Sequence, residues 1–541
     1  MSDRVMEKPG TEFVLERLWA AVRSWFSAPH RKAAFLAAFF GGLACHMYVF
    51  CNMLPNHDWQ HNFYATQNWI SYGRWFLQYT CEISSFAILP WLLGLLSVFY
   101  IALAAAFTVD LLKLHRPLLA GLAGLMMVTF PAVGSTAIYL YTMDGYMLAM
   151  LLAVLAIWCA ERWPNRMLGC ISGVVCMGLS LGAYQAYGAV TLLLCAFLLI
   201  LRMLRELPDL KEMVLQVIRM GIVVAGGFVF YYVMMQVMLM SSGSELGSYQ
   251  GIDNLSSGLS GGVGVLVQMV LNAAYHGWEF LTEGIPALGG SKTAAGMVRF
   301  LYIALLVFQL MLLGVRKQWR RWWAIPAQLG LLMLVPLGVN YVQIISPEVS
   351  YHLVMHYAAV LVFVFALCLL QEVMEDTALV GWFKQTAAVA VPLAGAVLVF
   401  CWCVMTNRGY TNMQYQYEES YATLVRLADR MEQCEGYTPG MKLMMPDYEW
   451  TFTNSYEVGD LTGLSGMGGM VMFDSLHYRN DLRTLFGLDF SGCDWDAAEP
   501  VCLSEEYKSM PVWPAQGSVR VIQGVMVVKT TDALDDLQPA G

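Results

Sequence analysis

Long apolar runs alternate with short polar connections over the first three quarters of the chain. They recur from Lys32 to Met405, and runs of about 18 to 25 residues are enough for a helix to cross the hydrocarbon of a bilayer. We predict about eleven membrane-spanning helices, near residues 33–54, 84–112, 117–140, 143–160, 166–184, 187–201, 213–239, 298–315, 322–342, 351–370 and 385–405. From Thr406 onward the pattern becomes that of a soluble domain.

The composition supports an α-helical polytopic membrane protein. Hydrophobic residues make up 58% of the 541 residues, charged residues only 13%, and the mean hydropathy is +0.54, values far from those of soluble domains. The first apolar run lacks a signal-peptide cleavage pattern, so we expect it to remain as a span. The predicted domains are an N-terminal segment (1–32), a transmembrane catalytic domain (33–405, with external loops 55–83 and 241–297) and a C-terminal domain (406–541).

Basic residues predict the orientation. Nineteen of the 22 Lys and Arg residues before Thr406 lie in the N-terminal segment and in alternate connections, and cytoplasmic loops carry the excess of basic residues. We therefore expect a multi-pass protein of the plasma (inner) membrane with a cytoplasmic N-terminus and an extracytoplasmic C-terminal domain. The acidity of the chain lies in that domain, which holds 20 acidic and 9 basic residues.

The C-terminal domain is predicted to be small and of the α+β class. An apolar stripe predicts a helix over residues 417–434, and short strands are expected at Lys442–Pro446 and in "VRVI" and "MVVK", which Gln523 and Gly524 join as a hairpin. A Cys493–Cys502 disulfide depends on the redox compartment and stays open. Three tryptophans, Trp450, Trp495 and Trp513, are candidates either for sugar binding or for the domain core.

The first external loop combines aromatic, acidic and basic residues in "NHDWQHNFYATQNWISYGRWF", residues 56–76. Helical spacing places Phe63, Trp69 or Ile70, Arg74 and Leu77 close to one face, which is typical of a helix lying along the lipid headgroups. One interpretation is an aromatic anchor without chemistry. The other uses Asp58 as a general base, with His57 and Trp59 beside it as substrate contacts.

Two further groups of polar residues are expected at the same side. Asp144, in "YTMD", follows the third span and serves either as a turn residue or in a site. Gln185 stands between Tyr184 and Tyr187 where two spans meet, and so short a break at membrane depth must be buried in protein or line a cavity. We expect a cavity there.

Later segments add an interfacial helix and two histidines. The loop 241–297 contains an apolar segment, Val263 to Leu281, that we predict to be a second interfacial helix. His352 and His356 have the i, i+4 spacing of one helix face, but two histidines without a third ligand are a weak metal signal. We expect them to hydrogen-bond to neighbours or substrate, with His352 in the substrate site.

Few cations are expected outside, namely Arg74, Lys292, Arg299 and Arg408. A phosphorylated lipid substrate needs such groups to bind its phosphate and stabilise the charge as it leaves. Anchoring to lipid headgroups is the alternative for each. Nucleotide-binding fingerprints are absent from the sequence, so an activated lipid is the expected donor, and no nucleic acid is expected among the partners.

Several short motifs together resemble a known family. They are "DW" at Asp58–Trp59, "GRW" at Gly73–Trp75, "YTMD" ending at Asp144, "SLGAYQAY" at Ser180–Tyr187 and "MPVWPAQGSV" in the tail. In this order they resemble the integral-membrane glucosyltransferases of the Gtr type II (GtrII) family, which are similar to GT-C glycosyltransferases.

The resemblance implies an inverting enzyme that moves a hexose, by analogy glucose, from a polyprenyl-phosphate sugar to a polysaccharide or glycolipid outside the membrane. Asp58 would be the catalytic base and Arg74 a clamp for the phosphate. Asp144, Tyr184, Gln185 and Tyr187 would line the site, with Asp144 as its second carboxylate. The need for a divalent cation, Mg²⁺ or Mn²⁺, stays open.

A transporter or flippase of a lipid-linked sugar is the strongest rival. Transporters tend to contain internal repeats and helices broken at the bilayer midplane, whereas this sequence has no repeat and an odd predicted number of spans. Replacing Asp58 by Asn separates the two, because an enzyme should lose turnover while a flippase should be little affected.

Overall fold

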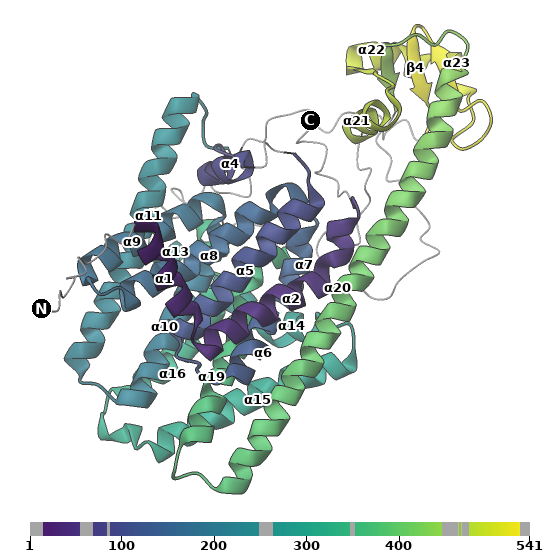
Figure 1. The fold of residues 1–541 in the computed structure, drawn as a ribbon. Coiled ribbons are helices and arrows are strands. Elements are labelled where there is room, and N and C mark those ends of the chain that lie inside the picture. Colours follow the sequence, from purple (N-terminus) through teal and green to yellow (C-terminus); the bar gives the residue numbers. More distant parts are fainter. Residues whose placement is uncertain are drawn as a thin grey trace, which may run out of the picture.

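The computed structural model describes residues 14–54, 69–83, 87–247, 263–346, 352–445, 464, 467 and 475–530 of the chain. Most of them belong to a bundle of long helices, and the C-terminal residues form a small domain above one end of it (Figure 1). The predicted class, a polytopic helical membrane protein with an α+β domain, is confirmed.

Nine helices in the described part of the chain are long and apolar enough to cross a membrane. They are α2 (Pro29–Cys51), α5 (Pro90–Leu111), α8 (Leu140–Arg162), α9 (Arg166–Ala183), α10 (Gly188–Glu206) with η1 (Gln185–Tyr187), α11 (Leu210–Ser242), α15 (Lys292–Val315), α19 (Val360–Glu375) with η5 (Leu353–Ala359), and α20 (Gly381–Glu432).

The helices α6 (Pro117–Thr129) and α7 (Pro131–Ala137) meet at an angle of 42° and form either a tenth, broken span or a re-entrant loop. The bend falls at Pro131, which cannot donate a backbone hydrogen bond to the preceding turn. In the described residues the number of spans is therefore nine or ten, fewer than the eleven predicted.

The predicted span at 322–342 is the one that fails. This segment is divided into α16 (Ala324–Met333), α17 (Val335–Val339) and α18 (Val342–Ile345), and none of the three is long enough to cross a membrane. Pro336 lies near the first break and removes a hydrogen-bond donor from the helical ladder. Hydropathy alone did not reveal the interruption, because the residues on both sides of Pro336 are apolar.

Burial separates inner from outer helices. The most apolar stretch of the η5–α19 span is entirely buried, whereas only 28% of the corresponding stretch of α11 is. In a membrane protein the outward apolar side chains of α11 face lipid, so their exposure is expected. The helix α19 therefore forms the centre of the bundle and α11 part of its lipid-facing surface.

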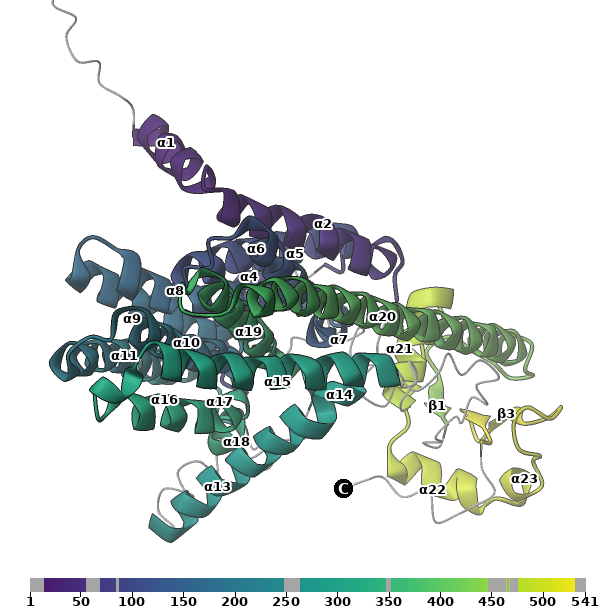
Figure 2. The same cartoon turned by 90° about the horizontal axis from the view of Figure 1, so that it is seen from below.

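Two shorter helices occupy the predicted loops. The helix α13 (Val263–Glu279) continues through a π-helical turn, η3 (Phe280–Gly284), into α14 (Ile285–Ala287), so the predicted helix in this loop is present. The first loop contains α4 (Trp75–Glu82), which begins after Arg74, and residues 69–73 before it form a turn instead of the predicted helix. Figure 2 shows α13 and the N-terminal helix α1 (Val14–Phe26) leaving the bundle on opposite sides.

The last span and the predicted helix 417–434 form one continuous helix. The 52 residues of α20, Gly381 to Glu432, run from the bundle into the C-terminal domain (Figure 1). The sequence predicts two helices here because the apolar pattern changes near Thr406, from membrane-facing residues to a single stripe. Helical geometry continues across that change without a break.

The C-terminal domain contains a four-stranded sheet. Its strands β1 (Lys442–Met444), β2 (Ser491–Gly492), β3 (Val519–Ile522) and β4 (Val525–Val528) have the order β2-β1-β4-β3. The predicted hairpin joins β3 to β4, and positive φ values at Gln523 and Gly524 (51° and 77°) fit a type I′ turn. Helices α21 (Ser475–Phe486), α22 (Trp495–Leu503) and α23 (Glu505–Lys508) complete the domain.

The open questions about this domain have structural answers. Cys493 and Cys502 are not bridged. Trp495 and Trp513 are half-buried and pack against the two apolar cores of the domain, as expected for core aromatics. Trp450 lies outside the described residues.

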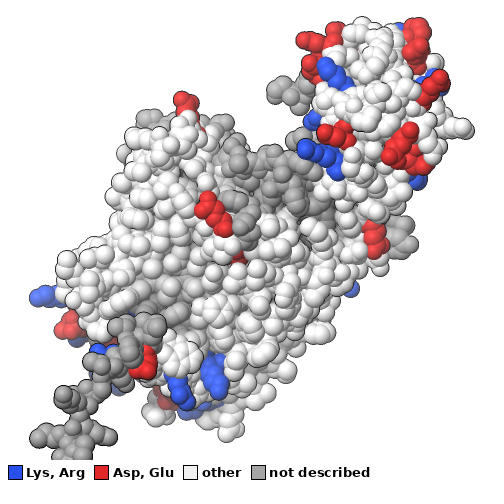
Figure 3. Space-filling view, turned by 45° about the horizontal axis from the view of Figure 1, so that its top comes forward, with Lys and Arg blue, Asp and Glu red and all other residues white. Residues whose placement is uncertain are grey.

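The two ends of the bundle differ in their charged residues. Figure 3 shows Lys and Arg mainly at one end of the bundle and on the C-terminal domain, with a few acidic residues on the largely uncharged surface between them. We call the first the arginine-rich end, and its buried or half-buried ion pairs include Arg31–Asp110 (2.7 Å), Arg219–Glu161 (2.6 Å), Arg205–Glu372 (2.7 Å) and Arg316–Glu372 (2.9 Å). We call the other the C-domain end. Basic connections predicted to share one side of the membrane therefore do share one end of the bundle.

Candidate functional site

A tight turn at the C-domain end positions Arg74. The turn runs from Trp69 to Gly73, and the Arg74 backbone N–H donates to the carbonyl of Trp69 (2.7 Å). Gly73 has φ +71°, and a Cβ added there would lie 2.5 Å from the Tyr231 hydroxyl oxygen and 2.9 Å from the side-chain nitrogen of Gln185. Only glycine satisfies both the backbone conformation and this close approach.

The side chain of Arg74 lies against two tyrosines. Its Nη1 donates to the hydroxyl oxygen of Tyr146 on α8 (3.2 Å), and its guanidinium lies 5.3 Å from the ring centre of Tyr184. The two tyrosine rings contact each other, with centroids 4.6 Å apart. The hydroxyl oxygen and the ring face both attract a cation.

Gln185 connects the same turn to α11. Its side-chain nitrogen donates to the carbonyl of Tyr72 (3.2 Å) and to the Tyr231 hydroxyl (3.1 Å). The backbone leaves helical geometry at Tyr184 (φ −155°), so the predicted break between α9 and α10 is present. We refer to Arg74, Tyr146, Tyr184, Gln185 and Tyr231 as the Arg74 cluster.

The break is buried in protein and does not line the expected cavity. Tyr184, Gln185 and Tyr187 are 4%, 6% and 1% exposed. The hydroxyl of Tyr341 donates to the carbonyl of Gln185, and the Tyr187 ring lies between those of Tyr184 (5.3 Å) and Tyr357 (5.9 Å). Packed side chains thus satisfy the interrupted backbone, which is the other way in which such a break is tolerated.

Asp144 lies on α8, two residues before Tyr146. It is 3% exposed, and its Oδ1 has no hydrogen-bond partner among the residues that the structure describes. Burial raises the pKa of the Cys81 thiol in α4, and the nearby Asp144 carboxylate raises that pKa further. Asp144 therefore lies close to α4 and is a buried helix residue, not an exposed turn residue.

The two histidines do not share a helix face as predicted. His352 precedes a 3₁₀ helix, η5, and His356 interrupts that helix with φ −102° and ψ 17°. His356 is stacked on Phe280 (4.3 Å between ring centres), and its Nε2 lies 3.3 Å from the side-chain oxygen of Asn340. The i, i+4 argument fails because it assumes α-helical geometry, which this segment lacks.

The remaining predicted residues lie apart from the Arg74 cluster or outside the described chain. Lys292 and Arg299 are exposed on α15, and Arg408 is exposed on α20. His57, Asp58 and Trp59 belong to residues 55–68, which lie outside the described residues. Within the described chain no group of three or more His, Cys, Asp or Glu side chains is arranged to hold a metal ion.

Tyr146 and Tyr231 are the members of the cluster that sequence reasoning missed. Both are tyrosines inside apolar spans, and a buried tyrosine hydroxyl usually has a polar partner. That signal marks them as candidates. It does not reveal that Arg74 and Gln185 are the partners, because those contacts join residues from α8, α11 and the turn before α4.

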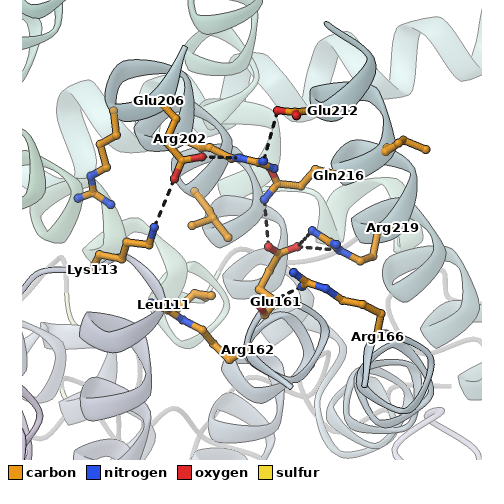
Figure 4. Close-up of a pocket in the computed structure, with 13 residues that line it drawn as sticks. Leu111, Lys113, Glu161, Arg162, Arg166, Arg202, Glu206, Glu212, Gln216 and Arg219 are labelled. Atoms are coloured by element: carbon orange, nitrogen blue, oxygen red, sulfur yellow. Dashed lines mark hydrogen bonds and ion pairs between the residues drawn. The ribbon is translucent and has the colours of Figure 1, made fainter. Parts of the chain in front are cut away.

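Another polar site lies at the arginine-rich end, where charged side chains from α8 to α11 surround a pocket (Figure 4). None of the residues predicted for the active site lines it. Chemistry expected at the C-domain end is therefore separated from this pocket by the length of the bundle.

A bundle of membrane-spanning helices with a cation held among tyrosines at one end defines an integral-membrane protein with a polar site near the bilayer surface. The chain belongs to the glucosyl transferase GtrII family, whose model matches residues 47–363, more than half of the sequence. Comparison with curated proteins and with solved structures finds no match.

Family membership implies a glucosyltransferase, an enzyme that moves a glucose residue from a donor to an acceptor. The matched region includes the whole Arg74 cluster, Asp144, Lys292, Arg299 and His352, together with residues 57–59. It ends before α20, so Arg408 and the C-terminal domain lie outside it.

Proposed function

We propose that the protein transfers a hexose, glucose by its family, from a polyprenyl-phosphate sugar to a polysaccharide or glycolipid at the C-domain end of the bundle. The observation that carries the proposal is the position of Arg74, which is half-buried beside Tyr146 and Tyr184 at this end. The fork of N–H groups of a guanidinium matches the oxygens of a phosphate.

The reaction needs one base and one charge stabiliser. An acceptor hydroxyl oxygen attacks the anomeric carbon of the sugar, and its proton passes to the Asp58 carboxylate. The bond between that carbon and the phosphate oxygen breaks, and its electron pair stays on the polyprenyl phosphate. Attack opposite the leaving group inverts the configuration. Arg74 stabilises the charge that grows on the phosphate.

Other residues have supporting roles in this proposal. Asp144, with one carboxylate oxygen lacking a described partner, is the second carboxylate of the site. Tyr184, Gln185 and Tyr187 shape its wall, and His57, Trp59 and His352 contact the substrates. The exposed Lys292, Arg299 and Arg408 draw the anionic donor to this surface by long-range electrostatic attraction, which added salt weakens.

Charge distribution supports the orientation. Ion-paired Arg residues gather at the end of the bundle opposite the Arg74 cluster, and basic residues are enriched on the cytoplasmic side of membrane proteins. We therefore propose that the arginine-rich end and the N-terminus face the cytoplasm of a plasma (inner) membrane protein. The Arg74 cluster and the C-terminal domain then lie outside, where surface polysaccharides or glycolipids are available as acceptors.

A transfer assay tests the proposal. Protein in nanodiscs receives polyprenyl-phosphate [¹⁴C]glucose and candidate glycan acceptors, and label in the acceptor is measured for the wild type, Asp58→Asn, Arg74→Gln and the control Arg320→Gln. Loss of the base should slow turnover roughly 10²- to 10⁴-fold, and loss of the clamp roughly 10²- to 10³-fold. Arg320 is exposed after α15 at the opposite end, so its variant should behave as the wild type.

Two results would contradict the proposal. Full turnover by Asp58→Asn would remove Asp58 as the base. Label that crosses the bilayer yet stays on the lipid with every sugar and acceptor tried would indicate a flippase instead.

A further inference from the structure

The pocket at the arginine-rich end is larger and more basic than helix capping requires. Its volume is about 430 Å³, within the range of about 300 to 1,000 Å³ typical of ligand sites. Figure 4 shows side chains from several helices pointing into it. The lining contains six basic residues, Lys113, Arg162, Arg166, Arg202, Arg205 and Arg219, but only three acidic residues, Glu161, Glu206 and Glu212.

The three acids of the pocket are already engaged. Glu161 accepts hydrogen bonds from Arg219 (2.6 Å) and Gln216 (3.1 Å). Glu206 pairs with Arg202 (3.1 Å) and Lys113 (3.4 Å). Glu212 lies 4.0 Å from Arg202. Three carboxylates against six cations leave the lining with a surplus of positive charge.

Two carboxylates behind the pocket reduce this surplus without removing it. Arg205 pairs with Glu372 (2.7 Å), and Arg162 pairs with Asp110 (3.7 Å). Both acids are shared, because Glu372 also binds Arg316 and Asp110 also binds Arg31. When Arg31 and Arg316 are added to the bases, and Glu372 and Asp110 to the acids, the cations still outnumber the carboxylates.

Two arginines of the pocket also have side-chain nitrogens that bind no carboxylate among the described residues. The Nη2 of Arg205 is buried with no hydrogen-bond partner among the described residues, an arrangement that is costly unless a ligand or water satisfies it. Arg166 donates to the neutral backbone carbonyl of Glu161 (3.1 Å), a contact that leaves its charge in place. Both arginines point to an anionic oxygen ligand.

One side of the pocket is apolar and faces the surface. Leu215 lines the pocket and is 56% exposed. It belongs to α11, whose next turns carry the exposed Ile218 and Ile222. In a bilayer this row contacts lipid chains, so a molecule held by the basic residues can extend an apolar part along α11.

We propose that this pocket binds a phosphate group, supplied by the headgroup of an anionic phospholipid whose chains lie along α11. Arg166, Arg205 and Lys113 contact the phosphate oxygens. A soluble phosphate would meet the same nitrogens but gain nothing from Leu215 and α11. The site is separate from the Arg74 cluster and does not depend on the proposed transfer reaction.

Binding is measured on the purified full-length chain by two probes. The first is native mass spectrometry of protein exchanged into micelles containing phosphatidylglycerol or phosphatidylcholine, which counts retained lipids. The second is the shift of the thermal unfolding midpoint by inorganic phosphate in detergent, with equal ionic strength of chloride as the reference. We expect selective retention of phosphatidylglycerol and a weaker response to phosphate.

Matched variants connect the binding to the pocket. Lys113→Gln/Arg166→Gln removes two exposed cations of the lining, and Lys317→Gln/Arg320→Gln removes two exposed cations of the same end outside it. The pocket variant should retain phosphatidylglycerol at least about tenfold less well, because hydrogen bonds to charged groups are the strong ones. The control should bind as the wild type.

A second variant shows whether weaker binding results from the pocket itself and not from loss of the folded structure. Arg205→Lys keeps a positive charge beside Glu372 but removes the partnerless Nη2, and it should also weaken binding. Saturable binding of lipid or of phosphate that is lost in both pocket variants supports the site, and the two probes tell which source supplies the phosphate. Binding that is absent, or equal in pocket and control variants of unchanged unfolding midpoint, would overturn it.

Discussion

The two ends of the helical bundle differ in the groups that contact their arginines. At the arginine-rich end, Arg205, Arg219 and Arg316 are bound by Glu161 and Glu372 at 2.6 to 2.9 Å. At the C-domain end, Arg74 lies against the hydroxyl of Tyr146 and the ring of Tyr184. The carboxylate contacts join helices at the first end, whereas the contacts with Tyr146 and Tyr184 orient the guanidinium of Arg74 at the second.

The ion pairs at the arginine-rich end have a structural role, and we propose a role in turnover for Arg74. Buried ion pairs at the arginine-rich end join the ends of helices that are distant in sequence, since Glu372 on α19 binds both Arg205 on α10 and Arg316 after α15. The guanidinium of Arg74 can bind an anionic substrate through its fork of N–H groups. Removing charge at the first end should therefore reduce stability, and disturbing the second end should reduce turnover.

The largest effect on stability is expected for Glu372→Ala. Glu372 is 5% exposed and binds two arginines, and its loss leaves both without this carboxylate. Breaking a buried pair costs about 3 to 5 kcal/mol. We expect a strongly lowered midpoint of thermal unfolding in detergent, followed by tryptophan fluorescence.

A matched control lies one turn away on the same helix. Glu375 pairs with His115 (2.8 Å) and Arg116 (3.2 Å) but is 35% exposed, and exposed pairs contribute about 0 to 1 kcal/mol. Glu375→Ala should therefore unfold close to the wild type. Equal destabilisation by both variants would contradict the contrast between buried and exposed pairs.

A smaller effect, on both stability and turnover, is expected for Gly73→Ala. Positive φ costs an L-residue about 1 to 2 kcal/mol, and the added methyl group would lie 2.5 Å from the Tyr231 hydroxyl, so the turn that positions Arg74 must move. A displacement of about 1 Å at a catalytic group can cost about 10²-fold in rate. Unfolding midpoints and glucose transfer are measured on the same preparation.

Gly243→Ala is the control for this substitution. Gly243 ends α11 with φ +64°, and a Cβ added there meets nothing within 4 Å. It should show the backbone cost without the collision, so its stability falls while turnover per folded molecule is kept. If Gly73→Ala also keeps full turnover, the Arg74 cluster is not part of the catalytic site.

Patterns that depend on local chemistry were predictable from sequence. Most spans, the helix α13 and the β3–β4 hairpin follow from hydrophobic runs and from the turn residues Gln523 and Gly524. Two errors have local causes that hydropathy does not measure. Pro336 interrupts a segment that is apolar on both sides, and α20 continues through a change of pattern without a breaking residue.

The site was only partly predictable because its contacts join distant segments. Sequence singled out Arg74, Asp144 and the break at Gln185, which carry unusual residue types for their positions. It missed Tyr146 and Tyr231, whose role depends on α8 and α11 meeting the turn before α4. Tyr184, Gln185 and Tyr187 at the break are buried, and the hydrophobic pattern does not specify how tightly helices pack around them.

The smallest effect concerns an exposed pair in the C-terminal domain. Lys442 on β1 donates to Asp494 before α22 at 2.8 Å. This hydrogen bond lowers the pKa of Asp494 and raises the pKa of Lys442. The contribution of Asp494 to stability is therefore fully present above its unfolded pKa of about 4 and is lost as the pH falls through the lower folded value. That of Lys442 is present below its unfolded pKa of about 10 and is lost as the pH rises through the higher folded value.

Asp494→Asn tests this linkage, because Asn serves as a helix N-cap as well as Asp does but cannot form the ion pair. The wild type should have a slightly higher thermal unfolding midpoint than the variant from about pH 5 to pH 9. This difference should disappear as the pH falls below about 4. Added salt should shrink it as well, because both groups are exposed. Unfolding midpoints of the full-length protein across this pH range measure the gap. A gap that persists at pH 3 would mean that packing, rather than charge, distinguishes the two side chains.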